Sequence, residues 1–131
     1  REDAVVNKLT PVYRNISIKN IVVEQSSQFL KVNGLPESPL SNLLIENASV
    51  NSKKLITLND AKGVVLKNIK VSSADSLIQV LDSKNIAFEN VHFDVPGNEV
   101  LTEIKGDNAG NIVFRDCVPA KPKGWETTSH Q

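Results

Sequence analysis

Residues 42–50 read NLLIENASV, and the same short motif returns as VVLKNIKV at residues 64–71 and NIAFENVHF at residues 85–93. A further copy, RNISIKNIVV, stands upstream at residues 14–23, and a last one, NIVFRDCV, stands at residues 111–118. The shared unit is close to Asn-Ile-x-apolar-charge-Asn-apolar-x-apolar. A repeat of roughly 20 to 30 residues built from short β-rich runs is the signature of a solenoid.

Stacking the five copies in register produces columns that test this reading. Two columns contain only apolar residues: Ile16, Leu43, Val64, Ile86 and Ile112, then Ile18, Ile45, Leu66, Phe88 and Phe114. A third column alternates in charge: Lys19, Glu46, Lys67, Glu89 and Arg115. In parallel coils, equivalent residues lie about 4.8 Å apart, so opposite charges in successive coils pair. Each exposed pair contributes roughly 0 to 1 kcal/mol, so the column specifies register more than stability.

The second Asn of the unit forms a column of its own, made of Asn20, Asn47, Asn68 and Asn90, with Asp116 in the last copy. The alternation of apolar and polar residues resets after this position. We therefore expect turns stacked through an inward ladder of amide hydrogen bonds. Two segments, Asn15-Ile16-Ser17 and Asn47-Ala48-Ser49, match glycosylation sequons, and a place in an inward ladder makes the second match accidental.

These patterns predict an all-β protein, a right-handed single-stranded parallel β-helix of about four to five coils, the right hand being usual for parallel crossovers. Residues 14–118 form the coils, residues 1–13 a lead-in or N-terminal cap, and residues 119–131 a C-terminal tail. We expect Trp125 to fold back on the last coil. Thr102 falls in an inward column of the fourth coil, which predicts a bulge or shift there. Antiparallel hairpins are the structural alternative, but the motif spacing favours strands running in one direction.

Composition narrows the function classes. The chain has 131 residues, a formal net charge of zero and one cysteine. One domain is expected from this length. The zero net charge gives no electrostatic reason to expect binding to nucleic acid or to an anionic membrane. The sequence has no apolar run long enough to span a bilayer, and no signal segment is recognised at its start. The single cysteine excludes an internal disulfide and disfavours a metal cluster, and we expect no cofactor and no metal site.

With the register set, TPVYRNISIKNIVV (residues 10–23) and VNGLPESPLSNLLIENASV (residues 32–50) resemble the C-terminal coils of polygalacturonase-like glycoside hydrolases, the pectin-cleaving family 28. The turn GLPESP at residues 34–39 is the most specific part, and the resemblance covers residues 10 to 117. It implies a secreted or periplasmic, metal-independent protein whose partner is a pectic, galacturonan-type polysaccharide.

The family's catalytic motifs are missing from this chain. It has no Asn-Thr-Asp strand, no Asp-Asp pair, no Arg-Ile-Lys strand, and neither His92 nor His130 precedes a glycine. Inverting hydrolysis needs two carboxyl groups about 6.5 to 9.5 Å apart. We therefore expect no catalytic residue here, and interpret the chain as the C-terminal end of such an enzyme or as a relative without catalytic coils.

The second strand of each coil matches the strand series that carries substrate contacts in the family. Its outward side chains would continue the sugar-binding cleft, and the candidate carbohydrate-binding residues are Lys31, Asn33, Thr57, Asn59, Gln79 and Glu103. The competing reading is an ordinary solvated strand face. No aromatic side chain stands there for sugar stacking, which weakens the binding reading.

Other reactive residues fit structural roles better. His92 falls in an outward column beside Lys70, which indicates a surface histidine, and Cys117 falls in an inward apolar column, which indicates a buried hydrophobe. Three carboxyl groups could be proposed as catalytic acids, but the sequence places no second carboxyl group beside any of them: Glu24, Glu37 and Asp60.

Three functions stay open: a non-catalytic segment of a pectin-degrading hydrolase, an independent carbohydrate-binding module, and a structural module. An uncapped end coil exposes strand edges, so an end-to-end homo-oligomer or further N-terminal coils would cover it.

Overall fold

The computed structural model of this chain describes residues 6–7, 14–125 and 129–130, and they form a parallel β-solenoid of about four turns. The strands and the one short helix are β1 (Val6–Asn7), β2 (Arg14–Asn33), β3 (Leu40–Asn59), β4 (Ala61–Ser73), β5 (Leu77–Leu81), β6 (Lys84–Asp94), η1 (Pro96–Asn98), β7 (Leu101–Lys105), β8 (Gly110–Arg115) and β9 (Ser129–His130). The predicted all-β parallel fold is confirmed. The lead-in or N-terminal cap predicted for residues 1–13 lies outside the described residues, except for residues 6 and 7.

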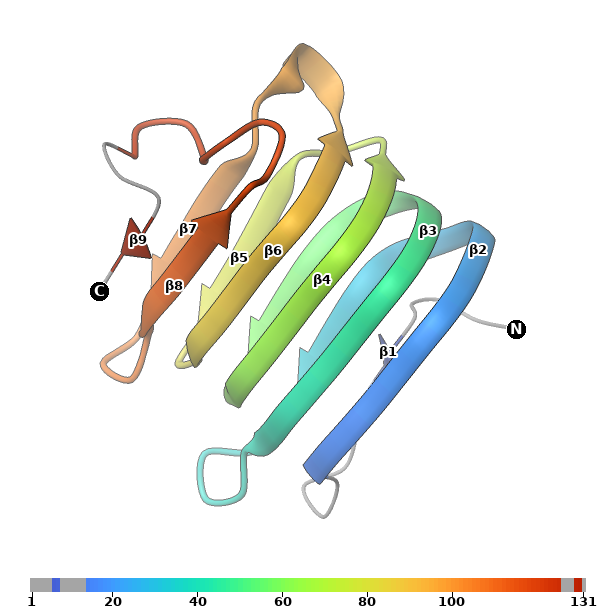
Figure 1. The fold of residues 1–131 in the computed structure, drawn as a ribbon. Coiled ribbons are helices and arrows are strands. Elements are labelled where there is room, and N and C mark those ends of the chain that lie inside the picture. The colour runs from blue at the N-terminus through green and yellow to red at the C-terminus, as the bar shows by residue number, and fades with distance from the viewer. Residues whose placement is uncertain (1–5, 8–13, 126–128, 131) are drawn as a thin grey trace.

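The strands form two layers that face each other across the core (Figure 1). The near layer holds residues 14–23 of β2, residues 40–50 of β3, and β4, β6 and β8; the far layer holds the ends of β2 and β3, and β5 and β7. In Figure 1 the near strands run upward, the chain crosses to the far layer at the top, and each coil lies farther left than the one before it. This path is a right-handed coil, as predicted.

The register of the near layer is the one that the repeats predict. Lys19 pairs with Glu46, Glu46 with Lys67, Lys67 with Glu89, and Glu89 with Arg115. Arg115 Nη1 lies 2.8 Å from Glu89 Oε2, and Lys19 Nζ lies 3.9 Å from Glu46 Oε1. The charge alternation therefore identifies which residues are neighbours in successive coils.

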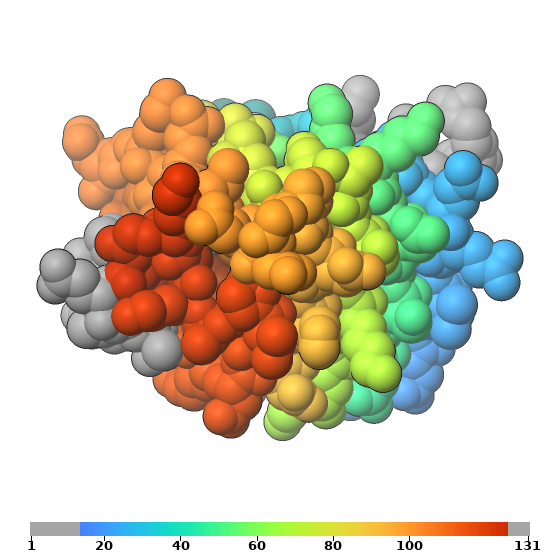
Figure 2. Space-filling view, turned by 90° about the horizontal axis from the view of Figure 1, so that it is seen from above, coloured from blue at the N-terminus to red at the C-terminus, as the bar shows by residue number. Residues whose placement is uncertain are grey.

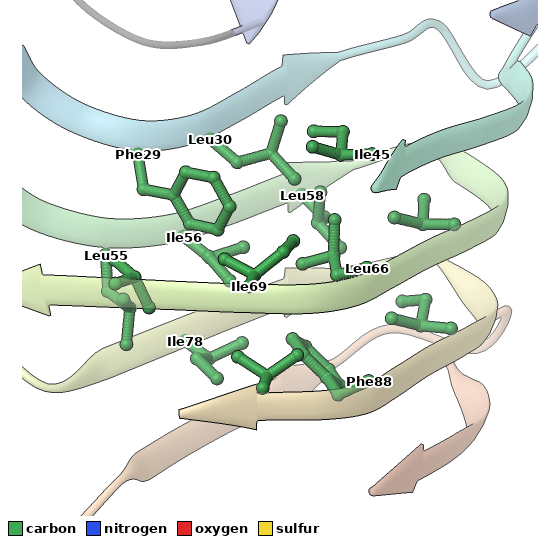
Figure 3. Close-up of a cluster of buried hydrophobic side chains, with 14 of the residues drawn as sticks. Phe29, Leu30, Ile45, Leu55, Ile56, Leu58, Leu66, Ile69, Ile78 and Phe88 are labelled. Carbon is green, nitrogen blue, oxygen red and sulfur yellow. The ribbon is translucent and has the colours of Figure 1, made fainter. Parts of the chain in front are cut away.

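Both layers contribute apolar side chains to one continuous core (Figure 3). Leu and Ile side chains of successive coils stack between the layers, and examples that are almost fully buried are Leu30, Ile45, Leu55, Ile56, Leu58, Leu66 and Ile69. Burial of such side chains contributes roughly 1.5–3 kcal/mol each, so the repeated apolar columns are the main source of stability.

Asparagines at the turns adopt left-handed backbone conformations and join in ladders. Asn20, Asn47 and Asn68 have φ values of 59°, 59° and 56°, a region that Asn tolerates better than most residues. Asn47 Nδ2 donates to Asn20 Oδ1 at 3.1 Å, Asn68 Nδ2 to Asn47 Oδ1 at 3.2 Å, and Asn90 Nδ2 to Asn68 Oδ1 at 2.8 Å. The ladder is confirmed, but Asn47 is exposed rather than inward, so burial gives no argument about its sequon.

A second ladder, which the sequence reasoning missed, uses the first Asn of the repeat, which is present in four of the five copies. Asn42 Nδ2 donates to Asn15 Oδ1 at 2.9 Å, and Asn111 Nδ2 donates to Asn85 Oδ1 at 2.7 Å. Gly63 occupies the middle place of this column at φ +83°, where a Cβ would lie 2.7 Å from Asn42 Oδ1. The close approach of the Asn42 side chain therefore requires glycine there.

The last coil differs from its prediction at Thr102. The bulge expected there is absent, because β5 and β7 pair in continuous register and Thr102 takes the inward place opposite Ile78. The Thr102 hydroxyl is satisfied by Trp125, whose Nε1 donates to Oγ1 at 3.2 Å. As predicted, Trp125 folds back on the last coil, edge-on to Phe114 with ring centroids 5.2 Å apart. A register shift does occur in the first coil, between Val23 and Ser26.

Candidate functional site

The predicted site residues lie on the outward side of the far layer. The register aligns Lys31 with Thr57, Thr57 with Gln79, and Gln79 with Glu103, while Asn33 aligns with Asn59 two positions along. In the first three coils the inward neighbours of these residues, such as Val32 and Leu58, are buried. We call this surface the polar strand face, defined by Gln28, Lys31, Asn33, Lys54, Thr57, Asn59, Gln79, Glu103 and Lys105.

A row of hydrogen bonds crosses the polar strand face from coil to coil. Gln28 Nε2 donates to Thr57 Oγ1 at 3.0 Å, Thr57 Oγ1 donates to Gln79 Oε1 at 3.4 Å, and Gln79 Nε2 donates to Glu103 Oε1 at 2.8 Å. Lys105 Nζ lies 3.2 Å from Glu103 Oε2. The row fixes the side-chain positions, so the face presents an ordered set of amide, hydroxyl and carboxylate groups.

A parallel contact links the asparagines beside this row. Asn59 Nδ2 donates to Asn33 Oδ1 at 2.8 Å. All six predicted residues therefore share one face, and five of them are joined to a neighbour on it by a side-chain hydrogen bond. Lys31 is the sixth, and it lies half-buried at the edge of a depression.

Two shallow depressions share this face. The first, of about 260 Å³, is lined by Gln28, Lys31, Lys54, Thr57, Asp75 and Gln79 among others. The second, of about 300 Å³, is lined by Thr57, Asn59, Gln79, Glu103 and Lys105 among others. The sequence reasoning missed Lys54, because it precedes the strand run and reaches the face only through its pairing with Gln28.

Charge is distributed unevenly over the polar strand face. Lys31 and Lys54 lie at the first depression. At the second depression, hydrogen bonds from Gln79 and then Lys105, together with the Lys105 charge, hold the pKa of Glu103 below its usual value. Glu103 is therefore ionised at neutral pH and cannot act as a proton donor there.

The carboxylate in the first depression, that of Asp75, accepts hydrogen bonds from the backbone. Asp75 Oδ1 accepts hydrogen bonds from the backbone N–H groups of Leu55 at 3.2 Å and Leu77 at 3.3 Å. Its position holds the two far-layer strands together at their starts. These two charge-assisted hydrogen bonds give the carboxylate a structural role.

The three acids left without partners by the sequence reasoning, Glu24, Glu37 and Asp60, are not among the residues that line the two depressions. Asp60 lies at the turn after β3, where burial first, and then the charges of Asp82 and Glu37, raise its pKa. Glu24 lines a separate polar depression with Lys53 and several serines. The structure therefore brings Glu37 and Asp60 together at a turn but leaves Glu24 apart from them.

A further hollow, of about 460 Å³, is lined by residues of β3, β4 and β6 together with η1 and the segment after β8. Figure 2 shows the end of the molecule at which η1 (orange) and the segment after β8 (red) lie. His92 is exposed there and pairs with Lys70 in the register, as predicted. Other lining residues are Ser72, Asp94, Asn98, Val118 and Pro119. The repeats predict that His92 and Lys70 share an outward column. They do not predict the part of the hollow formed by η1 and Pro119, because these segments occur outside the repeats.

Cys117 is buried, as its inward column predicts. Burial raises the pKa of its thiol, and Sγ donates to the backbone carbonyl oxygens of Phe88 and Arg115. The protonated, enclosed thiol is a poor nucleophile.

Among residues 6–7, 14–125 and 129–130, no group of three or more His, Cys, Asp or Glu side chains could hold a metal ion. The same residues include no helix with the length and apolar character needed to cross a membrane. Comparisons of the chain with protein-family models, curated proteins and solved structures find no match. The polygalacturonase-like resemblance therefore rests on the sequence motifs, and its β-solenoid is the part that the structure shows.

Proposed function

We propose that this chain is a non-catalytic β-helix segment that binds a pectic, galacturonan-type polysaccharide on its polar strand face and extends the groove of a polygalacturonase-like, family 28 hydrolase. The observation that carries the proposal is the hydrogen-bonded row from Gln28 through Thr57 and Gln79 to Glu103. It repeats amide and hydroxyl groups at the coil spacing of about 4.8 Å along the solenoid axis. A linear polymer of hydroxylated rings would meet similar groups at each coil.

The charges orient such a polymer on the face. A galacturonate carboxylate would lie at the first depression, where Lys31 and Lys54 supply ammonium donors. The ionised Glu103 would repel a carboxylate at the second depression, so neutral hydroxyl groups are favoured there. The face therefore favours a uronate carboxylate at the first depression and sugar hydroxyl groups at the second.

The same groups support binding without hydrolysis. Inverting hydrolysis pairs a protonated acid with a carboxylate that activates water. Here Glu103 is held ionised and therefore cannot serve as the protonated acid, and both Asp75 contacts with backbone N–H groups are structural. Since pectic polymers lie outside the cytoplasm, the proposal places the protein in a secreted or periplasmic location.

Calorimetric titration with oligogalacturonides, with product sizing on the same samples, tests the proposal. We expect saturable heat and no shortened products. Lys31→Ala and Lys54→Ala should each weaken binding several-fold, whereas Lys67→Ala removes an equal charge from the near layer and should not. Glu103→Gln should tighten binding, because it removes the repulsive charge and retains an acceptor for Gln79. Shortened products would contradict the non-catalytic role.

An independent carbohydrate-binding module and a structural module are the alternatives. The structural reading is favoured by one observation: the polar groups of the row already satisfy one another. Equal heats with neutral and uronic oligosaccharides would favour a general binding module. No heat with either ligand would overturn the binding proposal and support a structural role.

A further inference from the structure

The asparagine ladders have a direction. In each ladder hydrogen bond, Nδ2 of the later coil donates to Oδ1 of the earlier coil, as in Asn42 to Asn15 at 2.9 Å and Asn47 to Asn20 at 3.1 Å. A side-chain amide presents its oxygen and its NH₂ group on opposite sides. Because Oδ1 of Asn15 and Asn20 faces the second coil, the NH₂ group of each faces away from the stack.

Those two NH₂ groups have no hydrogen-bond partner among the described residues. Every later member of the ladder through Asn20, as far as Asn90, uses its NH₂ group to donate to the coil before it. The first coil therefore ends the ladders with two donors at the edge of the solenoid.

The apolar column at this edge is incompletely covered. Ile16 and Ile18 are half-buried, whereas Leu43 and Ile45, their counterparts in the second coil, are almost fully buried. Within the described residues, β2 pairs with β3 along one edge, and its other edge is paired only where Val6 and Asn7 of β1 lie parallel to Leu30 and Lys31. The parallel stacking thus continues over the far layer, while no described residue pairs with the outer edge of residues 14–23.

Charge completes the description of this edge. The side chain of Lys19 is 53% exposed and has Glu46 as an ion-pair partner in the second coil. The alternation Lys19, Glu46, Lys67, Glu89, Arg115 would be extended by an acidic residue on the open side of Lys19.

We propose that residues 14–23 of β2 dock a parallel β-strand of a partner protein with the pattern Asn-apolar-x-apolar-acidic-Asn. The two amide oxygens of that strand accept from Asn15 and Asn20, its acidic residue pairs with Lys19, and its apolar residues cover Ile16 and Ile18. Addition of a strand to an exposed sheet edge is an established mode of peptide recognition. This surface is separate from the polar strand face and does not depend on polysaccharide binding.

A second copy of this chain fits the edge less well. The outer edge of β8 pairs antiparallel with β9, at Ile112 with His130 and Val113 with Ser129, so the other end of the solenoid is covered. Stacking of that end on β2 would also place Arg115 opposite Lys19. Two copies joined through their β2 edges would set NH₂ donors against NH₂ donors.

A peptide with the sequence of residues 42–50, NLLIENASV, is a probe with the required pattern. Its binding to the full chain, measured by fluorescence anisotropy, should be at least ten-fold tighter than that of the same peptide with Glu46→Lys. Lys19→Glu in the protein should reverse this preference. Arg115→Glu, at the other end of the charge column, is the matched control and should leave both affinities unchanged.

Asn20→Asp separates the docking role from a structural one. The aspartate keeps an acceptor for Asn47 Nδ2 and tolerates the left-handed backbone, but it lacks the outward NH₂ donor. We expect several-fold weaker peptide binding with little change in the thermal midpoint. Equal binding of the two peptides, an unchanged preference in Lys19→Glu, or a dimer of the chain that Lys19→Glu dissociates would each overturn the proposal.

Discussion

The two ends of this solenoid differ in how far their strand edges are covered. At the C-terminal end, β9 pairs antiparallel with β8, and Trp125 lies edge-on to Phe114 at an interplanar angle of 89°. At the N-terminal end, β2 presents half-buried Ile16 and Ile18, and the described partner of its open edge is the short parallel strand β1. A reversed strand and a bulky aromatic end the repeat, whereas a parallel edge leaves it open to extension.

The repeat itself changes at the closed end. Asp116 replaces asparagine in the ladder column at φ 55°, and it has no NH₂ group with which to donate to Asn90. Thr102 replaces an apolar residue and accepts a hydrogen bond from Trp125. Departures from the repeat therefore coincide with the cap, while the first coil keeps the full motif. This contrast indicates that coils with the full motif stack on one another, and that the stack is capped where the motif is lost.

Removing the aromatic cap should have a large effect, which only the interior ladder position below should match. Trp125→Ala removes the contact with Phe114 and the hydrogen bond to Thr102, and we expect a loss of about 2–3 kcal/mol in unfolding free energy, less than for a fully buried Trp. Ile16→Ala at the open end should cost about 1 kcal/mol, because that side chain is only half-buried. Chemical denaturation of both variants measures the difference, and equal losses would contradict the proposed asymmetry of the ends.

A ladder position inside the stack should matter more than one at its edge. Asn47→Ala removes two ladder hydrogen bonds and strains a backbone at φ 59°, for an expected cost of about 2–3 kcal/mol. Asn20→Ala has the same backbone strain but loses one such bond, so its cost should be about 1 kcal/mol smaller. Asn47→Gly and Asn20→Gly relieve the strain and isolate the hydrogen bonds. The ladder argument fails if the interior and edge variants unfold at the same denaturant concentration.

The smallest effect is expected at the turn after β3. Because the pKa of Asp60 is raised in the folded protein, its protonated form favours folding, and that contribution is lost as pH rises through the folded pKa. Asp60→Asn should therefore raise the thermal midpoint by about 1 °C at pH 7, and the gain should vanish below about pH 3. Asp107→Asn, in an exposed loop, is the control. A gain that persists in acid would show that charge is not its cause.

Much of the fold could be predicted because each coil repeats the same columns. The pairing of Lys19 with Glu46 and of Ile18 with Ile45 follows from aligning two motifs, and the structure has both pairs. The wrong prediction at Thr102 arose because a hydroxyl in an apolar column was read without its partner, Trp125, which comes 23 residues later. Lys54 was missed for a related reason, since its neighbour Gln28 belongs to another coil.

The sequence by itself determined the parallel stacking, the register of the near layer and six of the outward residues on the far layer, because these follow from a pattern that recurs from coil to coil. The tertiary structure decided the direction of the asparagine ladders, the hydrogen-bonded row across the polar strand face and the two unlike ends. These features depend on side-chain orientation and on segments such as η1 and residues 119–125 that occur once. The residues that contact these segments are determined by how the coils stack, and no repeating pattern along the chain identifies them.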